Sequence, residues 1–173
     1  MKNKACIFAG SFDPITLGHI EVVNKCLTKY KKVFVVVGEN GKKTPFFTDK
    51  ERLELVKKAF EGEDRVVPIL YADYKNEYYD FLLNNNARVY VRGIRNKKDK
   101  EYELKQKKLN KNLYPKVKTK FINCSKKYRH ISSSMVKERL LNGKGVEGFV
   151  PSKIILNIQK LLQKKTNNKT NNS

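Results

Sequence analysis

Short apolar segments alternate along this chain with longer segments of helical periodicity. Segments this short and apolar are typical of strands that are buried on both faces of a parallel sheet. They cover residues 5–9, 33–37, 66–70 and 89–91, and part of a fifth lies at 121–124. The pattern predicts five strands separated by other elements.

Between these segments, apolar residues recur every three or four positions, which predicts helices. The clearest helices are at 20–30 and 48–60, and the second opens with Thr48 and Glu51, a capping-box pair. Further helices are predicted at 78–83, 99–112, 134–141 and after Pro151. The order predicts an α/β fold: a Rossmann-like, doubly wound, mainly parallel five-stranded sheet with helices on both faces.

The chain has 173 residues, which suits a single domain. We place this domain at residues 1–163. Residues 164–173 are basic and rich in asparagine and contain no apolar side chain, so they are expected to form a disordered tail.

The net charge of +21 has two explanations. Solvated lysines could simply cover the surface, or an anion could be the partner: a nucleic acid, a membrane surface or a polyphosphate substrate. Cys6, Cys26 and Cys124 lie far apart, as expected of buried free thiols in a reducing cytosol. No apolar run reaches membrane-spanning length and no signal peptide is evident, so we expect a cytoplasmic protein without a membrane partner.

Ligands of doubly wound sheets bind beyond the carboxyl ends of the strands. The first strand is followed there by a turn at 10–14 and a helix that begins near His19, a combination that suits phosphate. Gly10 and Gly18 could instead serve the turn alone, with His19 a surface residue.

Other strands are followed by similar chemistry. Arg92 and Arg95 flank Gly93 at the carboxyl end of the fourth strand and indicate a phosphate clamp, although surface arginines are the alternative. Residues 130–134 precede a helix and could bind phosphate through serine hydroxyls and amides, or form a plain N-cap. Lys42 and Lys43 follow the second strand and could add positive point charges at the same edge. The alternative is that they are a solvated pair in a flexible loop. These groups are predicted to meet at one edge of the sheet.

At these residues the chain resembles the phosphopantetheine adenylyltransferase family. The matching motifs are residues 10–19, Lys43 with Pro45 and Phe47, residues 92–95 with Tyr102 and Glu103, and residues 131–137. The similarity covers about residues 4–163. The chain departs from the family pattern at Ser11, where threonine is usual, at Arg129 and His130, and in the tyrosine-rich segment 71–79.

The resemblance implies a reaction in which an adenylyl group passes from ATP to 4′-phosphopantetheine, with Mg²⁺ as cofactor and a homohexamer as the assembly. It implies that His19 contacts the transferring phosphate. It places the acceptor against Ser11, Lys43, Arg92 and, through the backbone, Tyr78. It places ATP against Ser11, Phe12, His19, Gly93, Ile94, Arg95, Glu103, Tyr128, Arg129, His130, Ile131, Ser132, Ser133 and Ser134.

The acceptor phosphate is largely dianionic at neutral pH, since its second pKa is about 6, and it needs no general base. We expect Lys43, Arg92, Arg95, His19 and Mg²⁺ to offset the repulsion between two polyanions. One alternative is a sister nucleotidyltransferase that uses another phosphorylated acceptor. Another is a basic nucleic-acid-binding domain, but the basic and aromatic residues follow no known nucleic-acid motif, so no nucleic-acid partner is expected.

Overall fold

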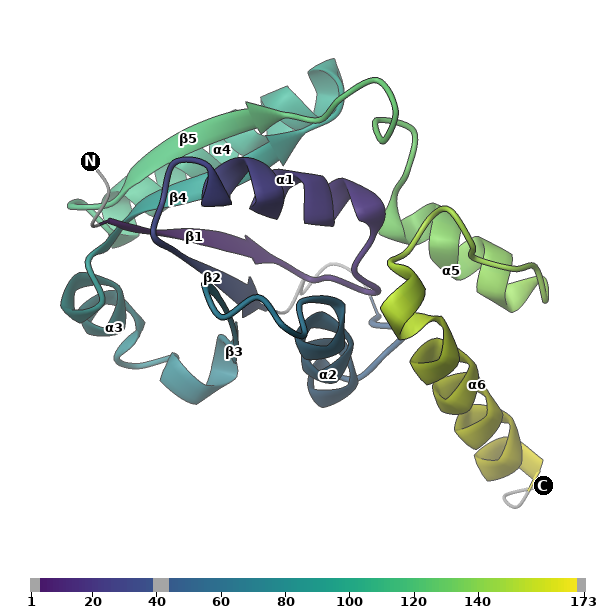
Figure 1. Ribbon diagram of the computed structural model, residues 1–173. Helices are drawn as coiled ribbons and strands as arrows, with labels where there is room; N and C mark the ends of the chain where they lie inside the picture. The colour runs from purple at the N-terminus through teal and green to yellow at the C-terminus, as the bar shows by residue number, and fades with distance from the viewer. Residues whose placement is uncertain (1–3, 39–43, 171–173) are drawn as a thin grey trace.

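Five parallel strands form the centre of the computed structural model, which describes residues 4–38 and 44–170. Their order across the sheet is β3-β2-β1-β4-β5 (Figure 1). The strands are β1 (Ala5–Gly10), β2 (Lys32–Val37), β3 (Val66–Leu70), β4 (Ala87–Ile94) and β5 (Lys118–Asn123). The predicted doubly wound α/β fold is confirmed, and the strand order reverses between β1 and β4.

The helices confirm the predicted positions to within a few residues. They are α1 (Leu17–Leu27), α2 (Asp49–Ala59), α3 (Tyr78–Asn84), α4 (Lys97–Leu113), α5 (Ser133–Leu141) and α6 (Ile155–Thr170), with short 3₁₀ turns at Ala72–Tyr74 and Ser152–Ile154. The capping box of α2 is present: the Thr48 N–H donates to Glu51, and the Glu51 N–H donates to Thr48. None of the described helices is long and apolar enough to cross a membrane.

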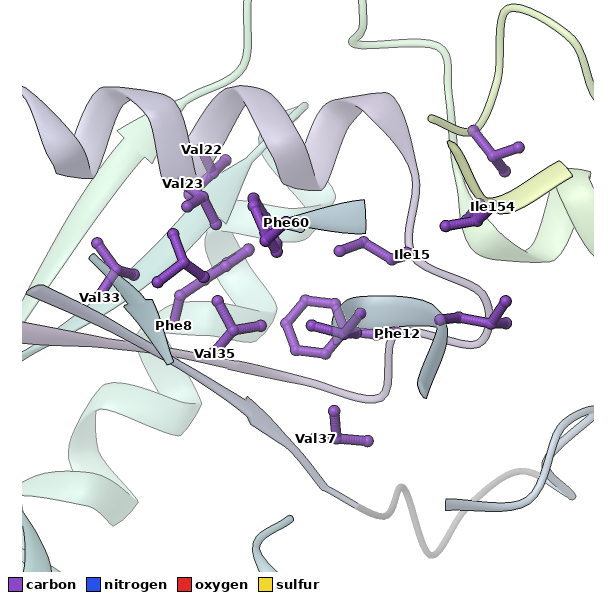
Figure 2. Packing of buried hydrophobic residues seen from close by; sticks show 14 of the residues in the cluster. Phe8, Phe12, Ile15, Val22, Val23, Val33, Val35, Val37, Phe60 and Ile154 are labelled. Atoms are coloured by element: carbon purple, nitrogen blue, oxygen red, sulfur yellow. The ribbon is translucent and has the colours of Figure 1, made fainter. Parts of the chain in front are cut away.

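Helices cover both faces of the sheet. On one face, β1 and β2 pack against α1, α2, α5 and α6 in a core that includes Phe8, Val22 and Val35 (Figure 2). On the other face, Ile7 and Phe34 pack against Tyr78 and other residues of α3. The free thiols of the three cysteines are buried, as expected. The central strands are apolar on both faces because both faces are covered.

Two elements extend further than the sequence predicts. Strand β4 continues to Ile94 because it pairs with β5, with Arg92 opposite Phe121, so Arg92 and Gly93 belong to the strand itself. Helix α6 continues to Thr170 through the segment expected to be disordered, and Lys165 lies 3.8 Å from a carboxylate oxygen of Glu51. The described part of this tail is therefore helical, because it continues a helix that is anchored in the core.

Candidate active site

The turn that joins β1 to α1 lies at the carboxyl ends of the strands, where their order reverses. Phe12 takes a left-handed backbone conformation there (φ 45°), and only 1% of its surface is exposed. Its ring packs edge-on against Phe8 and His19, with centroid distances of 5.4 and 5.1 Å. A Cβ atom on Gly10 would lie 3.1 Å from this ring, which explains the glycine. A ligand in the turn can therefore contact Phe12 only through its backbone.

His19 belongs to the first turn of α1 and faces back toward the turn. Its Nδ1 atom accepts a hydrogen bond from the Thr16 backbone N–H at 3.1 Å and lies 3.1 Å from the Thr16 hydroxyl. Since Nδ1 accepts, a neutral ring must carry its proton on Nε2. His19 thus offers a fixed N–H donor on the side of the ring away from Thr16.

The surroundings keep this ring neutral. Burial of the ring, and secondarily the positive charge of Arg95, lower the pKa of His19 from 6.5 to about 4. Burial and the charge of Arg95 both disfavour the imidazolium form. The expectation that His19 supplies positive charge is therefore corrected for the free protein: at neutral pH it is a hydrogen-bond donor without charge.

Arg95 joins the end of β4 to two other parts of the site. Its Nε and Nη2 atoms donate to the two carboxylate oxygens of Asp99, at 2.8 and 3.1 Å, and Nη1 donates to the carbonyl of Ile131 at 3.3 Å. The bidentate pair fixes the plane of the guanidinium. Arg95 therefore brings together α4, β4 and residues 128–134, which we call the serine segment.

Arg92 lies inside β4 and is paired. Its Nε donates to Glu103 at 2.5 Å and its Nη1 donates to the Ala9 carbonyl at 3.1 Å. Burial raises the pKa of Glu103 although Arg92 opposes this shift. The neighbouring Gly93 has a packing role, because a Cβ atom there would lie 3.1 Å from Val22 of α1. Ile94 is buried.

The serine segment contacts the turn between β1 and α1 directly. Ser132 caps α5 by accepting from the Met135 N–H, so the N-cap interpretation is confirmed for this residue. Ser133 instead donates from its hydroxyl to the Pro14 carbonyl at 2.9 Å. Ile131 is buried, Tyr128 is half-buried, and Arg129, His130 and Ser134 are exposed. The segment is thereby held beside the β1 turn.

Tyr78 and Lys43 are two further residues that were predicted to bind the acceptor. The Tyr78 side chain is buried at the start of α3, with its hydroxyl 3.1 Å from that of Tyr90, so only its backbone remains for the contact expected there. Lys43 lies outside the described residues. The turn, His19, Arg95 and Ser133 do meet at one edge of the sheet, as predicted.

Sequence reasoning missed two buried polar residues that hold the turn. Asp13, 4% exposed, accepts from the backbone N–H groups of Phe46 and Phe47 at 2.9 Å and pairs with Lys137 at 3.1 Å. Arg52 of α2 donates to the Ser11 carbonyl. A signal for Arg52 existed: it precedes Leu55 and Val56 by three and four positions, which places a charged residue on the apolar face of its helix.

Comparison with known proteins agrees with this arrangement. The model of the family described as cytidylyltransferase-like matches residues 7–139. A phosphopantetheine adenylyltransferase of Wigglesworthia glossinidia brevipalpis is 36% identical over 165 residues, which cover 95% of this chain and 96% of the relative. One of Dictyoglomus turgidum is 37% identical over 146 residues, covering 84% and 89%, and one of Clostridium novyi is 34% identical over 155 residues, covering 90% and 94%.

Among solved structures, a Vibrio parahaemolyticus chain assigned as a nicotinate-nucleotide adenylyltransferase superimposes with a TM-score of 0.65. It is 18% identical, and the match covers 91% of this chain and 93% of that one, so the likeness concerns the fold. The relatives found by sequence show the family as well as the fold, because they match this chain over most of its length. The chain belongs to the phosphopantetheine adenylyltransferase family, within the cytidylyltransferase-like group.

Proposed function

We propose that the protein transfers an adenylyl group from ATP to 4′-phosphopantetheine, which gives dephospho-coenzyme A and pyrophosphate. The observation that carries the proposal is the convergence of His19, Arg95 and Ser133 on the β1 turn, in a chain whose relatives carry this activity in their names. The acceptor phosphate attacks the α-phosphorus of ATP in line, and the P–O bond to the departing pyrophosphate breaks. No proton has to be removed from the dianionic acceptor.

The chain's own residues position the two substrates and stabilise the transferring phosphate. The Nε2–H of His19 donates to an oxygen of the transferring phosphate, and Arg95 supplies positive charge beside it. The N–H groups of the turn suit the remaining phosphate oxygens, whereas the N–H groups of Leu17 and His19 in α1 already donate to the carbonyls of Phe149 and Thr16. Arg92 and Lys43 are proposed to bind the acceptor phosphate, with Arg92 held in place by Glu103.

Magnesium enters this proposal with ATP. In the described part of the chain, no group of three or more His, Cys, Asp or Glu side chains could hold a metal ion. Bound to the phosphates of ATP, Mg²⁺ would neutralise charge on the departing pyrophosphate. No step of the proposal requires a protein ligand to the metal.

The assembly and location are proposals as well. Helix α4 exposes large apolar side chains, including Tyr102, Leu109 and Leu113 at 49, 54 and 60%. Such exposure supports an interface between subunits. The homohexamer and the cytoplasmic location are proposed from the family resemblance. Light scattering after size-exclusion chromatography should give a mass near six times 20.1 kDa, and a monomer would contradict it.

Pyrophosphate release tests the reaction directly. The protein is incubated with MgATP and either 4′-phosphopantetheine, nicotinamide mononucleotide or nicotinate mononucleotide, and in a further arm with CTP and glycerol 3-phosphate. We expect release with 4′-phosphopantetheine and a rate with the other acceptors lower by at least about a hundredfold. Faster release with a mononucleotide would assign the protein to a sister reaction.

A further inference from the structure

Arg52 is a buried cation behind the nucleotide turn. Only 2% of its surface is exposed. Its Nη1 atom donates to the Ser11 carbonyl at 2.6 Å and to the Gly38 carbonyl at 2.8 Å. The Gly38 N–H donates to the Gly10 carbonyl at 3.0 Å, so the guanidinium joins the segments that follow β1 and β2 just where the pairing of these strands ends.

The charge of Arg52 is not balanced nearby. No carboxylate of the described residues lies within ion-pair distance of its guanidinium, whereas Arg92 and Arg95 both have one. Its Nε atom is buried and has no hydrogen-bond partner among the described residues. A buried cation without a counter-ion is costly, and a fully apolar side chain would avoid that cost. The arginine therefore needs a reason beyond packing.

The peptide that Arg52 holds supplies such a reason. In a trans peptide the carbonyl and the following N–H point in opposite directions. A guanidinium that fixes the Ser11 carbonyl from the α2 side consequently fixes the Phe12 N–H toward the opposite side. A cation on the carbonyl also polarises the peptide and strengthens that N–H as a donor. The Phe12 ring is buried, so this backbone is the part of Phe12 that a ligand can contact.

We propose that Arg52 is a positioning residue for the nucleotide, acting through the Ser11–Phe12 peptide, and that the phosphates of ATP are the missing counter-charge. The inference rests on the proposed function for the identity of the nucleotide. Arg52 does not touch the substrate. It directs the Phe12 N–H at the phosphate and adds buried positive charge behind it.

Binding of MgATP to the folded protein tests the proposal by calorimetry. The test variant is Arg52→Met, which keeps the length of the stem and removes donors and charge. Arg65→Met is the matched control, because Arg65 is exposed and pairs with Glu63 away from the turn. We expect Arg52→Met to raise the Kd for MgATP at least about tenfold and to lower kcat/KM for ATP by about a hundredfold, with the KM for the acceptor within about threefold. Arg65→Met should change each constant less than about twofold.

A merely structural role would lower the melting temperature and leave the Kd of the folded molecules unchanged, and that result would overturn the proposal. If Arg52→Met does not fold, Arg52→Lys decides: its ammonium ends one bond short of Nη1, so the Kd should still rise at least about threefold, and a parental Kd would overturn the proposal. A parent protein that binds MgATP but releases no pyrophosphate with 4′-phosphopantetheine would refute only the proposed acceptor. A parent that does not bind MgATP would overturn the role of Arg52 too.

Discussion

Replacing His19 with asparagine separates the two contacts of the imidazole ring. The Nδ1 atom accepts a hydrogen bond from the Thr16 N–H, and the Nε2–H is proposed to donate a hydrogen bond to the phosphate. The asparagine amide oxygen lies two bonds beyond Cβ, like Nδ1, and can keep the contact with Thr16. The glutamine amide nitrogen lies three bonds beyond Cβ, like Nε2, and can keep the donor instead. The two variants therefore remove opposite halves of the residue.

The magnitudes follow from these contacts. Removing one donor aimed at a transition-state oxygen typically costs about 3–4 kcal/mol, which corresponds to a fall in kcat of about a hundred- to a thousandfold. His19 is neutral, so we expect His19→Asn at the lower end, near a hundredfold. Thr16 is 1% exposed, and leaving its N–H without an acceptor costs about 1–3 kcal/mol. His19→Gln should lose that much stability, and His19→Asn should lose less than about 1 kcal/mol.

Initial rates of pyrophosphate release and urea unfolding measure the two effects on the same preparations. The expected result is a crossed pattern: His19→Asn is stable but slow, while His19→Gln is less stable but faster per folded molecule. A His19→Asn variant with kcat within about threefold of the parent would remove Nε2 from the mechanism. Equal stability of His19→Gln and the parent would show that the Thr16 contact contributes nothing.

Three further outcomes are expected, each measured by urea unfolding. Gly93→Ala should lower the free energy of unfolding by about 1–2 kcal/mol, because its Cβ would lie 3.1 Å from buried Val22; an unchanged value would show that α1 can shift. Asp13→Asn should cost about 3 kcal/mol, since the amide NH₂ that replaces one carboxylate oxygen cannot accept from the N–H group bound there and Lys137 loses its partner; a loss below about 1 kcal/mol would contradict this. The pKa of His19 is about 4 in the folded chain against 6.5 ordinarily, so the unfolded chain gains a proton first as the pH falls through that window. Stability should therefore decrease between pH 6.5 and 4 by up to about 3 kcal/mol, and His19→Asn should lack this part of the decrease, whereas an identical pH dependence would refute the assigned pKa.

The sequence predicted the elements well because their cause is local. The apolar runs of β1 and β2 and the capping box of α2 depend on residues that are neighbours in the sequence. Predictions failed where a distant partner decides the outcome. Strand β4 continues through Arg92 because β5 provides hydrogen-bond partners, and α6 continues past Lys164 because its earlier turns pack on the core.

In the candidate site too, the sequence predicts local features but not those that depend on distant residues. The positions of His19 and Arg95 followed from motifs at the ends of strands, and the structure brings both to one edge. The charge state of His19 did not follow, because it depends on burial and on Arg95, which lies 76 positions further along the chain. A motif can thus place a histidine at a phosphate while leaving open whether it acts as a cation or as a neutral donor.

The residues that hold the turn, of which sequence reasoning missed Asp13 and Arg52, have a common property: they bind the backbone of the turn or tie it to the backbone of a distant segment. Arg52 reaches the Ser11 carbonyl across 41 positions, Ser133 reaches the Pro14 carbonyl across 119, and Asp13 joins the turn to Phe46 across 33. Backbone groups are the same for every residue type, so such bonds leave no pairing pattern in the sequence. Because the proposed phosphate donors of the turn are also backbone groups, their accuracy depends on these distant side chains as much as on the motif itself.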